Sequence, residues 1–125
     1  MINKKKILYL SFDGLTDPLG RSQVVPLILE LSKDYNVNII SFEKKIFYQS
    51  SYNEISNKFF KNNINHYKIK FYKNYFVKTL SFFNYFFVIL RLIILNRVEL
   101  IHVRGYQPII FLYPILLFKK LKIIF

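Results

Sequence analysis

The sequence predicts an α/β domain in which a parallel sheet of five strands, in the spatial order 3-2-1-4-5, lies between two layers of helices. Short apolar runs alternate with stretches of helical periodicity, which is typical of right-handed βαβ units. The run at 7–10 is continuously apolar, as in a strand covered on both faces, and we interpret 99–103 as another buried strand. These two strands should be neighbours whose carboxyl ends bound a crevice.

The stretch from Lys4 to Ser32 combines the first strand, a glycine-bearing loop and a helix. Pro26 fits this helix if Ser22 is the N-cap, because amides in the first turn have no intrahelical partner. We therefore expect the helix to begin at about Ser22 and to leave N–H groups free to bind an anion. Its apolar stripe is Val24, Leu27, Ile28 and Leu31.

The other elements follow from periodicity and end signals. Strands are expected at 37–42, at 64–71 as an edge-like strand, and from 122 to 125, where the sheet would remain incomplete at the C-terminus. A capping box at Ser51 and Glu54 predicts a helix from about 52 to 62. A later helix should begin near Pro108 and be kinked at Pro114.

Three ionisable residues on these strands have competing interpretations. Glu43 follows the second strand, where an acid can bind ribose, but a solvated strand end is the preferred interpretation. His66 is expected to be exposed and non-catalytic, and His102 to be a satisfied core histidine. The sequence offers no set of metal ligands, so no metal site is expected.

The segment 77–97 is strongly apolar, yet its longest uncharged run, 79–90, is shorter than the about 20 residues of a membrane span. The pattern is typical of a helix that packs on a sheet or lies in a membrane interface. Its polar stripe is expected to contain Lys78, Ser81, Asn84, Tyr85 and Arg91.

The amino-acid composition restricts the classes of partner that the chain is expected to bind. The chain of 125 residues has no cysteine and a net charge of +12. The charge has two main explanations, a strong compositional bias towards Lys, Asn, Ile, Phe and Tyr, and an anionic membrane surface. No nucleic-acid-binding signature is visible, so no nucleic acid partner is expected. The lack of cysteine fits a reducing compartment, and the basic start is followed by too few apolar residues for a signal peptide, so we expect a cytoplasmic protein.

The crevice should lie between the loops 12–21 and 104–107. Its two arginines and its helix N-terminus favour phosphate or a phosphorylated ligand. The loop glycines are six positions apart, so the G-x-G-x-x-G dinucleotide fingerprint is absent, and an ordinary connection is the alternative. The residues expected there are Asp13, Gly14, Gly20, Arg21, Ser22, Arg104 and Gly105.

Residues 7–44, ILYLSFDGLTDPLGRSQVVPLILELSKDYNVNIISFEK, resemble the opening of family 4-type glycosyltransferases with the GT-B fold. A second, less strict block is 99–105. The resemblance implies that residues 1–125 form the amino-terminal, acceptor-side Rossmann-like domain, and that the carboxy-terminal, nucleotide-sugar-binding domain is absent. The matching positions are Asp13, Gly14, Asp17, Pro18, Leu19, Gly20, Ser22, Gln23 and Val24.

The resemblance also implies roles for the crevice residues. The donor-phosphate loop would contain Gly14, Gly20, Arg21 and Ser22. Gly20 would need to be small because backbone approaches a donor phosphate there, and Gly20→Val should weaken donor use while leaving the fold intact. The acceptor side would contain Asp13, Arg104 and Gly105, although many relatives carry histidine at the position of Arg104. No catalytic residue and no cofactor follow from it.

The expected protein is thus a glycosyltransferase fragment that needs a nucleotide-sugar donor and a glycan or lipid-linked acceptor, for example in polysaccharide biosynthesis. It would lie on the inner face of the cytoplasmic membrane, be inactive alone and be poorly soluble. The alternatives are a nucleotide- or dinucleotide-binding module and a non-catalytic membrane-surface protein.

Overall fold

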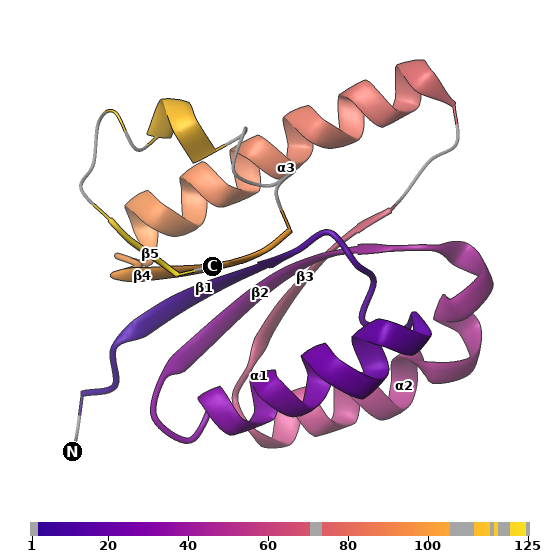
Figure 1. Ribbon diagram of the computed structural model, residues 1–125, viewed down its shortest axis with the longest axis horizontal. Coiled ribbons are helices and arrows are strands. Elements are labelled where there is room, and N and C mark those ends of the chain that lie inside the picture. The colour runs from indigo at the N-terminus through magenta and orange to yellow at the C-terminus, as the bar shows by residue number, and fades with distance from the viewer. Residues whose placement is uncertain (1–2, 71–73, 106–111, 116, 118–120, 125) are drawn as a thin grey trace.

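A parallel sheet forms the middle of the computed structural model, which describes residues 3–70, 74–105, 112–115, 117 and 121–124 (Figure 1). Its order is β3-β2-β1-β4-β5, and every pair of neighbours is parallel. The predicted fold class and strand order are therefore confirmed. The strands are β1 (Lys6–Ser11), β2 (Asn36–Glu43), β3 (Asn65–Lys70), β4 (Leu100–Arg104) and β5 (Lys122–Ile124).

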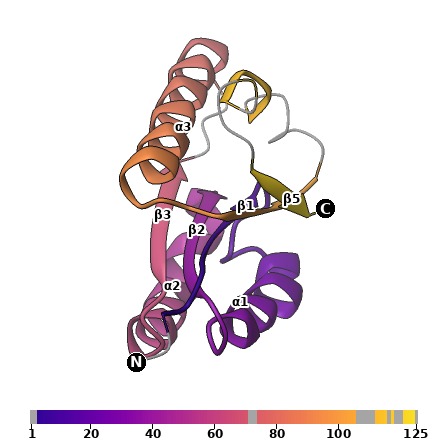
Figure 2. The same cartoon turned by 90° about the vertical axis from the view of Figure 1, so that its left-hand side faces the viewer.

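Helices cover both faces of the sheet, which gives the predicted three layers. One face carries α1 (Val25–Leu31) and α2 (Lys45–Lys61), and the other carries α3 (Tyr75–Leu95). Figure 2 shows the sheet between these two layers. Each crossover connects parallel strands, so the chain must return along one face before the next strand begins.

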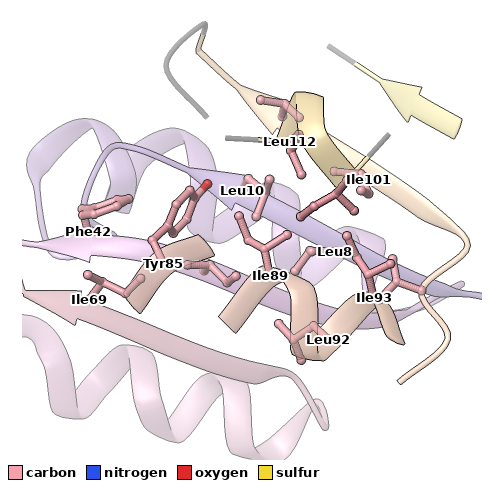
Figure 3. Packing of buried hydrophobic residues seen from close by; sticks show 14 residues of the cluster. Leu8, Leu10, Phe42, Ile69, Tyr85, Ile89, Leu92, Ile93, Ile101 and Leu112 are labelled. Carbon is pink, nitrogen blue, oxygen red and sulfur yellow. The ribbon is translucent and has the colours of Figure 1, made fainter. Parts of the chain in front are cut away.

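The two faces of β1 bury different halves of the core. Leu8 and Leu10 point towards α3 and pack with Tyr85 and Ile89, as Figure 3 shows. Ile7 and Tyr9 point the other way, into the cluster under α1 and α2. Both sets are almost fully closed to solvent, which explains why the run is apolar at every position rather than alternating.

The helix after β1 begins earlier than expected. Helical backbone starts at residue 18 and passes through a π-helical turn, Gly20–Val24, into α1. The Arg21 amide donates a hydrogen bond of 2.9 Å to the Asp17 carbonyl oxygen, so Asp17 rather than Ser22 lies at the start of the helix. Pro26 therefore lies beyond the first turn. The π turn ends at Val24, two residues before Pro26, so the hydrogen-bond register changes close to the position where an amide donor is missing.

The predicted start of α2 at a capping box is wrong. The helix begins at Lys45, directly after β2, and Ser51 lies inside it with a buried side chain. Ile55 and Phe59 of the same helix are buried against the sheet. This tertiary packing stabilises helical backbone through the Ser51 turn and overrides the local capping preference.

By length and composition alone, α3 could cross a membrane. In the structure one face of α3 covers the sheet with Tyr85, Ile89, Leu92 and Ile93. The prediction that Tyr85 belongs to a polar stripe is wrong, because its ring lies 4.9 Å from that of Phe42 in the core. The opposite face of α3 exposes a row of large apolar side chains: Phe76, Leu80, Phe83, Phe87 and Ile94.

Some predicted positions lie outside the described residues. These are the helix start at Pro108 and the strand ends at Phe71 and Phe125. Residues 112–115, which include Pro114, are helical.

Candidate functional site

An ion pair joins the loop after β1 to the end of β4 at the carboxyl edge of the sheet. Arg104 Nε donates to Asp13 Oδ2 at 3.2 Å, and Arg104 Nη2 donates to Gln23 Oε1 at 2.6 Å. The side chains of Arg104 and Asp13 are 29% and 43% exposed, so a ligand can reach both. The structure thus brings Asp13 and Arg104 together, as predicted. We call Asp13, Gln23 and Arg104 the crevice cluster.

Two aromatic side chains lie close to Arg104 on β1 and β4. Tyr9 and His102 are paired across β1 and β4, and their ring centroids are 4.6 Å apart. Burial lowers the pKa of His102, and the positive charge of Arg104 lowers it further. Burial raises the pKa of Tyr9. The positive charge of Arg104 and the hydrogen bond with Arg104 lower this pKa, but the effect of burial is larger. His102 is half-buried rather than fully enclosed.

The glycines of the β1 loop are required by packing within the protein. A Cβ on Gly20 would lie 2.0 Å from the Gly14 carbonyl oxygen, and one on Gly14 would lie 2.7 Å from the Phe42 carbonyl oxygen. Both contacts are with backbone, which cannot move aside. The expectation that Gly20 tolerates valine without loss of the fold is therefore wrong.

Gly105 is different. It has a φ of +93°, and a Cβ there would meet nothing within 4 Å. It continues the chain from Arg104 with an exposed, left-handed backbone that glycine adopts without strain. The glycine at this position thus serves the turn after β4, next to the crevice cluster.

Glu43 is the anchor of the β1 loop. Only 4% of Glu43 is exposed, and its carboxylate accepts hydrogen bonds from the Leu15 amide at 2.8 Å, the Thr16 hydroxyl at 2.6 Å and the Ser41 hydroxyl at 2.7 Å. The prediction of a solvated strand end is wrong. The ribose-binding alternative has no support either, because the carboxylate oxygens are occupied by the protein's own donors.

His66 belongs to the same buried network. Its side chain is 7% exposed, and Nε2 lies 2.7 Å from the Ser41 hydroxyl oxygen. Since that hydroxyl donates to Glu43, the neutral His66 must donate from Nε2. Burial lowers the pKa of His66 to about 4, although the Glu43 carboxylate acts in the opposite direction. The prediction that His66 is exposed is wrong, since Phe59 of α2 covers its ring edge-on.

Arg21 and Ser22 lie away from the crevice cluster. They line a groove of about 340 Å³ between the start of α1 and α2, together with Glu54 and Lys58. Glu54 is paired with Lys58 at 2.7 Å. The hydrogen bond from Lys58 lowers the pKa of Glu54, and the charges of Lys58 and Arg21 add to this effect. The structure thus divides the predicted site between two surfaces.

Several residues of the site had no predicted role. Gln23 was part of the sequence motif, but nothing in the spacing indicated that its amide would hold Arg104. Thr16, Ser41 and Tyr9 gave no signal, because their partners come from other strands. Among the described residues there is no group of three or more His, Asp or Glu side chains that could hold a metal ion.

Comparison with known proteins identifies a fold neighbour. No family model matches the chain, and no curated protein matches it either. Among solved structures it is similar to the crystal structure of a glycosyltransferase from Rickettsia africae ESF-5, with a TM-score of 0.61 and 19% identity. The match covers 97% of this chain and 29% of that one. At this identity the likeness shows the fold, so the chain has an α/β fold shared with part of a glycosyltransferase.

Proposed function

We propose that this chain is the amino-terminal, acceptor-side domain of a family 4-type glycosyltransferase with the GT-B fold. The observation that carries the proposal is the crevice cluster, which bridges the carboxyl ends of β1 and β4 in a fold shared with a glycosyltransferase. Ligands of open α/β sheets bind at this edge, where neighbouring crossovers leave in opposite directions.

In this proposal the acceptor binds at Arg104. Its guanidinium has five N–H donors. Among the described residues, Asp13 and Gln23 take two of them and Tyr9 forms a further hydrogen bond with Arg104, and the rest would be offered to phosphate or hydroxyl oxygens. Asp13 fixes the orientation of the guanidinium plane through its hydrogen bond. Gly105 has no side chain, so the backbone next to Arg104 does not obstruct the acceptor. The acceptor would be a glycan or lipid-linked glycan, as in the assembly of a surface polysaccharide.

The donor would be a nucleotide-sugar held mainly by a second domain. The main chain at Gly14 and Gly20 would face the donor phosphates, whereas Arg21 and Ser22, which line the separate groove beside α2, would not be part of this contact. We assign the contact with the donor phosphates to backbone N–H groups at the start of the helix. At both glycines neighbouring backbone leaves no room for a side chain that could make this contact.

Binding measurements test the proposal on the chain as it stands. We expect extracted lipid-linked glycans to bind more tightly than nucleotide-sugars, and Arg104→Ala to weaken glycan binding by about tenfold or more. Arg97→Ala, an exposed cation at the other end of β4, is the matched control and should bind as the wild type does. Preferential binding of a nucleotide that is indifferent to Arg104→Ala would instead favour a nucleotide-binding module.

We also propose that the domain lies on the inner face of the cytoplasmic membrane. The exposed row on α3 is apolar, and α3 contains no acidic residue, while Arg91 is exposed beside the row. An apolar face with cations at its border suits the interface of an anionic bilayer. The net charge of +12 favours the same surface.

A further inference from the structure

A small polar pocket lies at the amino edge of the sheet, at the opposite end of the strands from the crevice cluster. Its volume is about 230 Å³. The starts of β1, β2 and β3 and the ends of α2 and α3 surround it. Besides one valine, the lining residues are Lys6, Asn36, Asn38, Asn63, Asn65 and Asn96.

One wall of the pocket is fixed by a pair of amides. Asn38 is only 3% exposed, and its Oδ1 accepts a hydrogen bond of 3.1 Å from Asn65 Nδ2 on the neighbouring strand. The two residues are partners in the β2–β3 register. A buried amide is costly unless it is hydrogen-bonded, so this pair holds a defined geometry.

The opposite wall offers amides that the protein does not use. Asn63 follows α2 with a φ of 54°, and Asn96 follows the last turn of α3. Within the described part of the chain, neither side-chain amide has a hydrogen-bond partner. Two segments far apart in sequence thus present free donors and acceptors to one pocket.

The chemistry of this lining selects a ligand class. Each asparagine supplies one acceptor and two donors, which complements hydroxyl groups that both donate and accept. Among the described residues that line the pocket there is no carboxylate to balance a cation, and Lys6 is the single charged one. The volume is below the about 300–1,000 Å³ of typical drug-sized sites, and the lining is unusually polar.

We propose that this pocket binds a small, neutral, polyhydroxylated molecule of the size of a monosaccharide. The inference rests on the amide lining and is independent of the proposed function. It assigns a carbohydrate site to the edge of the sheet that is farthest from the crevice cluster.

The first test uses the wild-type chain labelled with ¹⁵N. Glucose, galactose and N-acetylglucosamine are titrated separately, and inorganic phosphate is titrated as the anionic probe. We expect at least one sugar to shift the side-chain amide signals of Asn63 and Asn96 in a saturable way. The proposal is overturned if none of the sugars does so, or if phosphate alone does so through Lys6.

The second test uses variants. Asn63→Gly keeps the left-handed backbone while it removes the amide, and Asn96→Ala removes the other free amide. The double variant should weaken sugar binding by about tenfold or more. Asn57→Ala with Asn84→Ala, both exposed on the outer surfaces of α2 and α3, is the matched control and should leave the affinity unchanged. Unchanged affinity in the pocket variant would place the sugar elsewhere.

Discussion

The Thr16 hydroxyl donates a hydrogen bond of 2.6 Å to the Glu43 carboxylate, and this contact fastens the loop after β1 to the end of β2. The carboxylate also holds the Leu15 amide at 2.8 Å. Asp13 precedes these residues in the same loop and faces Arg104. The position of an exposed crevice residue therefore depends on a carboxylate that is closed to solvent.

Thr16→Val should lower the free energy of unfolding by about 1.5–3 kcal/mol, the range for a hydrogen bond to a charged group. Valine has nearly the same shape, so the change removes the hydroxyl without leaving a large cavity. Urea unfolding measures the difference. Thr79→Val is the control, since the Thr79 hydroxyl bonds only the exposed helix backbone. Equal effects of the two variants would contradict the anchoring role of Glu43.

The stability of the domain should depend on pH through His66. Burial lowers the pKa of His66 to about 4 in the folded chain, whereas an unfolded histidine titrates near 6.5. Between these values the unfolded chain binds a proton that the folded chain does not bind. The free energy of unfolding should therefore fall as the pH drops through this window, by up to about 1.4 kcal/mol per pH unit.

His66→Gln separates this effect from the titration of the carboxylates. Glutamine retains an N–H donor towards Ser41 but has no charge to gain. Urea unfolding at several pH values should show a shallower pH dependence between about 4 and 6.5 for the variant than for the wild type. Parallel curves for the two proteins would show that His66 is not the responsible group.

Gly20→Ala should destabilise the domain more than Gly105→Ala. The new methyl group at residue 20 would lie 2.0 Å from a backbone oxygen, and overpacking of this kind costs about 1–3 kcal/mol or more. At residue 105 there is open space, and only the left-handed backbone opposes alanine, at about 1–2 kcal/mol. Thermal unfolding followed by circular dichroism compares the two. The reverse order would mean that the β1 loop can move away from the helix.

Flotation with liposomes tests membrane attachment. The chain should float with anionic liposomes more than with neutral ones, and high salt should release it, since each Lys or Arg near the surface contributes about 1 kcal/mol. Phe83→Ser with Phe87→Ser should reduce flotation. Phe60→Ser is the control, because Phe60 is 85% exposed but lies on α2. Equal binding to both liposome types, or resistance to salt, would argue against electrostatic attachment.

Under the proposed function, the 125-residue chain should not transfer sugar by itself. Transfer requires donor and acceptor in near-attack geometry, which supplies about 7–11 kcal/mol of the acceleration, and one wall of a cleft cannot provide it. Incubation of the chain with radiolabelled nucleotide-sugars and membrane acceptors measures whether any label is transferred. Reproducible transfer that Arg104→Ala abolishes would show that the chain carries the complete site.

The strand order could be predicted because it follows from patterns within single segments. The apolar run at 7–10 requires cover on both faces, and together with the strand–helix alternation and the buried strand at 99–103 it predicts that β1 lies inside the sheet. The meeting of Asp13 and Arg104 then follows from topology, since neighbouring parallel strands end at the same edge.

The environments of Glu43 and His66 could not be predicted in this way. A glutamate followed by lysines at a strand end is typical of solvated surface, and only the arrival of the β1 loop encloses it. His66 lies on an edge strand, and it is enclosed by Phe59 of α2 and by the Ser41 hydroxyl, which come from other segments of the chain. The sequence motif indicated that Gly20 must be small, but it did not show which atoms approach it.

The position of β1 in the sheet also affects how the chain folds as it is synthesised. Ile7 pairs with Val37 on one side and with Leu100 on the other. A ribosome completes β1 through β3 well before it reaches β4, so one edge of β1 waits unpaired, and Leu8 and Leu10 have no cover until α3 has emerged. This nascent form exposes a strand edge and apolar surface together, which is the state that chaperones bind and that aggregates most readily. Slowing translation between β3 and β4 would prolong that vulnerable interval.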